Sequence, residues 1–199
     1  MHYNPIIGPY NGHEYVDLGL PSGTLWATMN VGATSETDYG LYFAWGDTQG
    51  YTASQVGTGS GQKAFSWNDY VYGTQNNLTK YNSTDGLTIL ESTDDAAVVN
   101  MGGSWHMPSK NQMVELCNST YVTSTWVIDY QGSGVNGRLF TSVADSSKTL
   151  FFPASGYCGG SVMSVNGLLY MWSRSIYERD QKSAWPIYAY SGGTGMYNE

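Results

Sequence analysis

The chain has 199 residues, of which 41% are apolar, 15% aromatic and only 12% charged, so it is long enough for one domain with a core. Solvent-facing helix surfaces need charged, straight-chain residues, and this composition therefore predicts strands and loops more than helices. The net charge is −8 and no basic stretch exists, which excludes binding to nucleic acid. No apolar run is long enough for a transmembrane helix, and no signal peptide is visible at the N-terminus.

The N-terminal third predicts a lead-in, a strand pair and a long loop. Residues 1–11 carry no periodicity and form the expected lead-in, and residues 12–199 form the single expected domain. Apolar residues on both sides of Pro21–Gly23 predict a strand, a turn and a second strand within residues 13–33. Residues 49–86 are poor in aliphatic side chains. A loop of this length is uncommon unless it packs, and we expect it to pack through its aromatic residues Trp67, Tyr70, Tyr72 and Tyr81.

Two helices are expected in the middle of the chain. In the first, Ser92 is the expected N-cap, Asp94 and Asp95 lie where the helix dipole favours negative charge, and Gly102–Gly103 ends the element. Capping accounts for these two carboxylates better than catalysis does.

In the second helix, Ser109 and Gln112 have the spacing of a capping box. Met113, Leu116 and Cys117 share one face of this helix, which predicts that the helix packs on the core.

The pattern after residue 120 is typical of strands. A β-branched and aromatic run covers residues 122–130, Asn136-Gly137 has the signature of a tight hairpin, and residues 150–153 form a short apolar run. The last part predicts a strand, a polar loop over residues 177–183, a strand, a Gly-Gly turn and a final strand. The fold class predicted is α+β, with two short helices, a mostly antiparallel sheet and a large loop content.

No catalytic or metal-binding motif is present, so we expect neither an enzyme nor a cofactor. The histidines stand in no recognisable motif, and a structural role is favoured for His106. Metal-ligand spacings are missing, although the loop carboxylates of Asp47, Asp69 and Asp85 leave a calcium site open. Cys117 and Cys158 could form one disulfide or remain two free, mostly buried thiols, and both interpretations stay open.

The strand near the C-terminus alternates between two kinds of side chain. Trp185, Ile187 and Ala189 would face the core, and Pro186, Tyr188 and Tyr190 would face outward. A charged stretch precedes the strand in a chain otherwise poor in charge. Exposed aromatic side chains beside a charged loop are typical of binding surfaces, so this strand is the candidate site.

Several motifs in order resemble one known family: YVDLGLPSGTLWATMNVGA, DYGLYFAWGDT, LESTDDAAVVNMGGSWHMPS, FFPASGY and MWSRSIYERDQKSAW. The resemblance is to the Fibrobacter succinogenes major paralogous domain, which is related to the formylglycine-generating enzyme superfamily. It implies a C-type lectin-like fold over residues 12–199. The paired active-site cysteines of that enzyme have no counterpart here, so oxidation of that kind is not expected.

The resemblance also implies a function. Some domains of this kind are the variable proteins of diversity-generating retroelements in phages and gut Bacteroidetes, in which rewriting of adenines in AAC codons diversifies the last segment. That segment is about 171–198 here, and its frame of fixed residues would be Trp172, Ser173, Ser175, Ala184, Trp185 and Ser191. Pro186, Tyr188 and Tyr190, already expected to face outward, are among the positions reachable from an AAC codon, as is Asp180. Gln181 and Lys182 are not reachable, so diversification is not expected there.

We therefore expect a non-catalytic domain for ligand binding, cell adhesion or phage receptor recognition, with a protein or glycan on a cell surface as partner. The expected location is extracellular, at the cell surface or on a virion. The expected ligand-binding residues are Tyr177, Glu178, Arg179, Asp180, Lys182, Ser183, Pro186, Tyr188, Tyr190, Thr194, Tyr197 and Asn198. The alternative is a structural or adhesin- and pilus-like surface module of fixed sequence.

Overall fold

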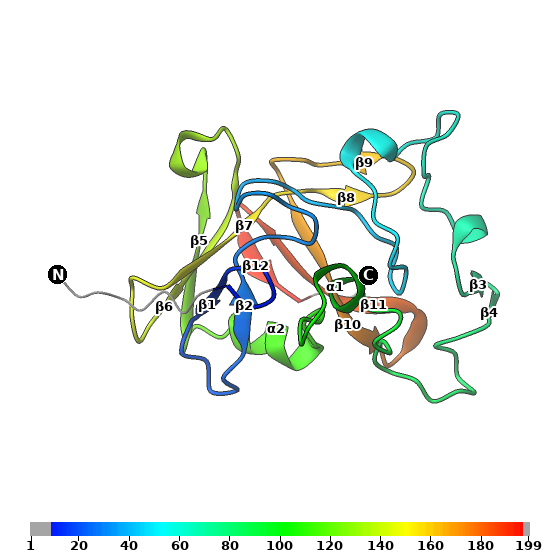
Figure 1. The fold of residues 1–199 in the computed structure, drawn as a ribbon, viewed down its shortest axis with the longest axis horizontal. Helices are drawn as coiled ribbons and strands as arrows, with labels where there is room; N and C mark the ends of the chain where they lie inside the picture. Colours follow the sequence, from blue (N-terminus) through cyan, green and yellow to red (C-terminus); the bar gives the residue numbers. More distant parts are fainter. Residues whose placement is uncertain (1–8, 197–199) are drawn as a thin grey trace.

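The computed structural model describes residues 9–196 and shows an α+β protein with two short helices and several antiparallel sheets (Figure 1). One three-stranded sheet consists of β5 (Val122–Val127), β6 (Gly137–Ser142) and β7 (Thr149–Pro153). The other consists of β10 (Leu169–Tyr177), β11 (Asp180–Tyr190) and β12 (Gly193–Gly195). No helix in the described part of the chain could cross a membrane.

Three two-stranded ribbons accompany the larger sheets. They pair β1 (Tyr15–Asp17) with β2 (Leu25–Ala27), β3 (Gly73–Thr74) with β4 (Asn77–Leu78), and β8 (Tyr157–Cys158) with β9 (Val162–Met163). The first ribbon confirms the strand, turn and strand expected within residues 13–33. Its turn closes with a hydrogen bond from Gly23 N–H to the Leu20 carbonyl oxygen, 2.8 Å long.

The main core lies where the two larger sheets, the first ribbon and helix α2 (Lys110–Leu116) meet. Met113 and Leu116 are fully buried, as their shared helix face predicts. They pack in one cluster with Leu18 and Trp26 of the N-terminal region, Phe140, Leu150 and Phe152 of the first sheet, and Leu169, Ile187 and Ala189 of the second. The second sheet is thus anchored on its inner face, which leaves its other face for contacts outside this core.

Helix capping follows the sequence at α2 and departs from it at α1 (Ala96–Met101). The capping box between Ser109 and Gln112 is present, as expected. Ser92 was the wrong N-cap for α1, because the Asp95 carboxylate accepts from Ala97 N–H and Val98 N–H and occupies that position. The N-cap directly precedes the first helical residue, and this helix begins at Ala96, three residues later than a cap at Ser92 would require.

Asp94, which was expected to help cap the N-terminus of α1, does not do so, and this expectation was wrong. It is 7% exposed and accepts hydrogen bonds from Lys80 and Tyr81 of the long loop. Tyr81 is 1% exposed and forms a second, smaller core with Leu90 and Ile176. The expectation that the long loop packs through aromatic residues is therefore confirmed, and Figure 1 shows this loop, with β3 and β4, on the side opposite β5.

Two turns differ from their sequence signatures. Asn136-Gly137 is not a two-residue hairpin turn, because Gly137 already pairs with Val127 and residues 128–136 form a longer connection with a 3₁₀ turn. The expected polar loop over residues 177–183 is also wrong. Tyr177 pairs with Asp180, so the turn comprises only two residues and β11 begins at Asp180.

Candidate binding face and aromatic cavity

The alternation expected in β11 is present for its C-terminal half. Ile187 and Ala189 are 1% and 0% exposed and belong to the main core, as expected. Tyr190 is 40% exposed, and Tyr188 is half-buried with its ring stacked on that of Tyr190 at a centroid distance of 5.5 Å. The turn after Tyr190 needs Gly192, because a Cβ there would lie 2.6 Å from the tyrosine ring. The sheet thus presents two stacked phenols on its outer side.

The N-terminal half of β11 departs from the expectation at two positions. Pro186 is fully buried and so does not face solvent. It lies opposite Trp172 in the strand register. The carbonyl oxygen of Ser173, the residue after Trp172, accepts a hydrogen bond from Trp45 Nε1–H. Trp185, expected in the core, is only half-buried.

Trp185 belongs instead to a surface cluster with Lys110, Tyr177 and Glu178, which we name the hairpin cluster. The Lys110 amine lies 3.8 Å from the centroid of the indole ring and 2.9 Å from Glu178 Oε1. The indole N–H donates to Glu178 Oε2, and the Tyr177 ring meets the indole edge-on at 5.1 Å. The hydrogen bond with Lys110 holds the pKa of Glu178 below its ordinary value. These contacts pre-order the start of the hairpin.

The remaining predicted residues divide into three groups. Arg179, Asp180 and Lys182 are exposed at the tip of the hairpin, and Ser183 behind them is half-buried. Thr194 pairs with Ala189, a core residue, and its hydroxyl is buried with no hydrogen-bond partner in the described part of the chain. Thr194 is therefore not displayed, because its position in β12 gives it the inward direction of Ala189.

Tyr197 and Asn198 lie outside the described residues.

Two aromatic residues outside the predicted site, Tyr157 and Tyr170, extend the outer face of this sheet together with Trp172, which was expected only as a fixed frame residue and is half-buried. In the strand register Tyr170 lies opposite Tyr188, and Trp172 lies opposite Pro186. The rings of Tyr170 and Trp172 meet edge-on at 5.3 Å, and Tyr157 lies 6.3 Å from Tyr170. We call Tyr157, Tyr170, Trp172, Tyr188 and Tyr190 the aromatic face. The period-two spacing of Tyr170 and Trp172 is the signal that would have found two of them.

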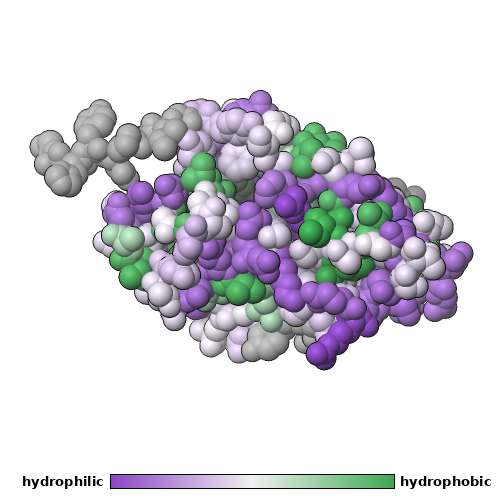
Figure 2. Space-filling view, turned by 90° about the horizontal axis from the view of Figure 1, so that it is seen from below, coloured by the Kyte–Doolittle hydropathy of each residue, from purple (hydrophilic) through white to green (hydrophobic). Residues whose placement is uncertain are grey.

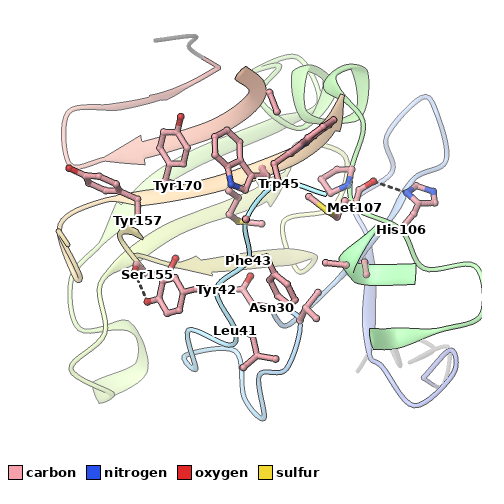
Figure 3. A pocket seen from close by; sticks show the side chains of 18 of the residues that line it. Asn30, Leu41, Tyr42, Phe43, Trp45, His106, Met107, Ser155, Tyr157 and Tyr170 are labelled. Atoms are coloured by element: carbon pink, nitrogen blue, oxygen red, sulfur yellow. Dashed lines mark hydrogen bonds between the residues drawn. The ribbon is translucent and has the colours of Figure 1, made fainter. Parts of the chain in front are cut away.

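The aromatic face leads into a cavity of about 870 Å³, within the size range of small-molecule sites. Tyr157, Tyr170 and Trp172 line it on one side, and the segment with Leu41, Tyr42, Phe43 and Trp45 lines it on the other. Figure 3 shows Tyr157 and Tyr170 on the strand side and Tyr42 across from them. Gln181, Lys182 and Ser183 of the hairpin also contribute to the lining.

The polar groups of the cavity wall are largely engaged with the protein. The Tyr42 hydroxyl donates to the Ser155 carbonyl oxygen at 2.7 Å, and the Tyr39 hydroxyl donates to Asn166 Oδ1 at 2.9 Å. Asn30 Nδ2 donates to the Tyr39 carbonyl oxygen at 3.1 Å. Burial, with smaller contributions from Cys158 and Tyr39, raises the pKa of Tyr42 to about 12. Both phenols therefore keep their protons at neutral pH and are fixed as donors to the protein.

The residues weighed for catalysis or metal binding do not form a cluster. Within residues 9–196, no three His, Cys, Asp or Glu side chains lie close enough to hold a metal ion. The three loop carboxylates accept bonds from their own loops: Asp47 from Gln49 N–H, Asp69 from the Ser66 hydroxyl and Asp85 from Leu87 N–H.

The two cysteines are free, which settles the open question of a disulfide between Cys117 and Cys158. Burial raises the pKa of each thiol to about 11, so neither has the low pKa of a reactive nucleophile. His106 is exposed, and its Nδ1 lies 2.9 Å from the Met107 carbonyl oxygen.

Comparison with known proteins gives no match: no family model fits the chain, and no curated protein or solved structure is detectably similar to it. In the view from below, hydrophobic residues form separate patches among hydrophilic ones (Figure 2). The aromatic face, the hairpin tip and the cavity are therefore the features on which a functional argument rests.

Proposed function

We propose that this chain is a non-catalytic ligand-recognition domain with a C-type lectin-like fold, which displays the outer side of β10–β12 and the hairpin tip to a partner. The family resemblance of the sequence motifs supports the fold, and the arrangement of two helices and antiparallel sheets is compatible with it. In this proposal the segment 171–198 is diversified as in retroelement variable proteins. The domain acts outside the cell or on a virion, on a protein or glycan of a cell surface.

One observation carries the proposal: the small frame residues Ser173, Ser175 and Ala184 are buried, whereas the expected variable positions Asp180 and Tyr190 are exposed. Of the other frame residues, Trp172 and Trp185 are half-buried and Ser191 is exposed, and the variable position Pro186 is buried. Ser173, Ser175 and Ala184 are 0%, 8% and 5% exposed. Ser175 Oγ accepts from Lys110 N–H at 3.1 Å, which ties the frame to α2. Buried frame residues keep the fold constant while exposed positions change, which is what a diversified binding surface requires.

The proposal is tested by binding of the purified protein to intact gut bacteria and to a glycan array. We expect Tyr188→Ala combined with Tyr190→Ala to abolish the signal found for the wild type, because aromatic anchors dominate such surfaces. A matched control replaces two exposed apolar residues remote from the aromatic face, Ile128→Ala with Val143→Ala. The control should bind as the wild type does.

Two outcomes would count against the proposal. If the double tyrosine variant binds as well as the wild type, the aromatic face is not the recognition surface. If the gene has no neighbouring reverse transcriptase and no template repeat differing at adenines, the diversified reading fails and a surface module of fixed sequence is favoured.

A further inference from the structure

The cavity behind the aromatic face has walls of constant chemistry. Most of its lining comes from segments outside residues 171–198, including Asn30, Leu41–Trp45 and Tyr157. A ligand held there would be recognised mainly by these residues, and Gln181, Lys182 and Ser183 of the hairpin would add further contacts. A ligand site in this cavity is separate from the proposed function, although the cavity adjoins the aromatic face.

The hydrogen-bonding capacity left on the wall favours a ligand that donates. The Tyr39 and Tyr42 hydroxyls donate their protons to acceptors within the protein. Towards a ligand, their oxygens can therefore act only as hydrogen-bond acceptors. The side-chain oxygen of Asn30 has no donor among the described residues, while its amide nitrogen is engaged.

The cavity also offers an unsatisfied donor. Trp26 lines it and is 7% exposed, and its indole N–H has no hydrogen-bond partner in the described part of the chain. A buried donor without a partner lowers the stability of the folded protein, and a ligand oxygen that accepted from it would remove this penalty. A ligand with hydroxyl groups can both donate and accept, and so suits both kinds of wall group.

The charges of the lining argue for a neutral ligand. Of the described lining residues, Lys63, Asp69 and Lys182 carry charge at neutral pH. Lys63 Nζ donates to the Asp69 carbonyl oxygen and lies near the Tyr51 and Phe65 rings, and the Asp69 carboxylate accepts from Ser66. These two are therefore engaged within the protein, and no cluster of like charges marks a site for an anion or a cation.

The partly exposed aromatic rings of the cavity wall could pack against the apolar side of a sugar ring. Tyr157 is 39% exposed, and its hydroxyl has no hydrogen-bond partner among residues 9–196. Tyr170 and Trp172 stand at 90° to each other and form a corner beside it. A pyranose ring has an apolar side of C–H groups that can pack on such rings, and hydroxyls around its edge that need polar partners. We propose that the cavity binds a neutral sugar ring, without calcium.

The test is saturation-transfer NMR with a panel of neutral methyl glycosides and disaccharides of glucose, galactose, mannose and N-acetylglucosamine, in EDTA. We expect at least one sugar to bind saturably, with the strongest transfer to the ring protons on its apolar side. Tyr157→Ala should lower the affinity for that sugar about fivefold or more, and Tyr157→Phe, which keeps the ring, should lower the affinity less. Tyr190→Ala should change sugar affinity less than twofold, because Tyr190 does not line the cavity.

Three results would overturn the inference: no sugar of the panel binding saturably, equal binding to Tyr157→Ala and wild type, or binding that requires calcium. Circular dichroism establishes whether Tyr157→Ala is folded, and if it is not, Tyr157→Leu, which also removes the ring, takes its place with the same expected loss. The proposed function is judged separately, by cell binding of the Tyr188 and Tyr190 double variant. A protein that binds sugars but no cell surface, or the reverse, would thus separate the two.

Discussion

Tyr170 and Tyr188 lie directly opposite each other in the antiparallel register of β10 and β11. Tyr170 contacts the ring of Trp172 in the cavity wall, and Tyr188 stacks on the exposed ring of Tyr190. The pair thereby joins the cavity to the displayed hairpin across one sheet face. A partner on that face could insert a group into the cavity while it contacts the hairpin, which would combine a constant contact with changeable ones.

The two stacked tyrosines should differ in their effect on stability. Tyr190 is 40% exposed, and its change to Ala should lower the free energy of unfolding by less than about 1 kcal/mol. Tyr188 is half-buried beside Tyr170, so Tyr188→Ala should cost about 1–2 kcal/mol. Urea unfolding followed by fluorescence measures both. A larger loss for Tyr190 than for Tyr188 would contradict this assignment of the outer side.

In β11, the sequence predicts the direction of each side chain correctly, but it does not predict how deeply each side chain is buried. Trp185 points to the same side as Ile187, as a period of two requires, but the core ends before Trp185, and Lys110 covers it in part. Pro186 alternates with Ile187 and so points outward, yet it is fully buried. Direction follows from local geometry, whereas coverage depends on segments far away in the chain.

The dependence on distant segments also explains why the sequence did not predict the cavity. Helix α2, its capping box and the strands around residues 15–27 follow from local patterns, and they are present. The cavity is built from loops whose positions depend on long-range hydrogen bonds, such as that from Tyr42 to Ser155. No local pattern encodes such a contact. The aromatic content of residues 39–45 is typical of a buried segment, and nothing in it indicates that a cavity lies against that segment.

The two candidate caps of α1 allow a direct comparison. Asp95 accepts from Ala97 N–H and Val98 N–H and also from Met107 N–H, so Asp95→Ala should cost at least about 1–2 kcal/mol of stability. Ser92 is exposed and three residues before the cap, so Ser92→Ala should change stability by less than about 0.5 kcal/mol. Chemical denaturation of both variants gives the answer. Equal losses would show that the helix begins earlier than Ala96.

Asp94 should make stability depend on pH in the acid range. Burial alone would raise its pKa, but hydrogen bonds from Lys80, Tyr81 and Tyr72 outweigh burial and lower the pKa to about 2. The folded-state pKa is below the unfolded value near 3.9, so the stabilisation is complete above roughly pH 5 and is lost as pH falls towards 2.

The comparison that isolates this effect is the isosteric variant Asp94→Asn. At pH 7 it should be less stable than the wild type by on the order of 2 kcal/mol, because the hydrogen bonds of a buried carboxylate are weakened. Between pH 5 and pH 2 the wild type should lose stability faster than the variant, so that the two curves converge. Denaturation series at several pH values measure this, and curves that stay parallel would show that Asp94 does not carry the dependence.

The cysteines offer a probe of the cavity that needs no knowledge of its ligand. Burial raises the pKa of Cys117 and Cys158 to about 11, so at pH 7 on the order of one thiol in ten thousand is ionised. Alkylation by iodoacetamide should therefore be much slower in the folded than in the unfolded protein, and its rate should still rise above pH 9.

Cys158 lines the cavity and Cys117 does not. An occupant of the cavity should slow alkylation of Cys158 alone, with Cys117 as the internal control, as peptide mass spectrometry would show. If both rates fell equally, the occupant would be stabilising the whole fold, and if neither fell, it would be bound elsewhere.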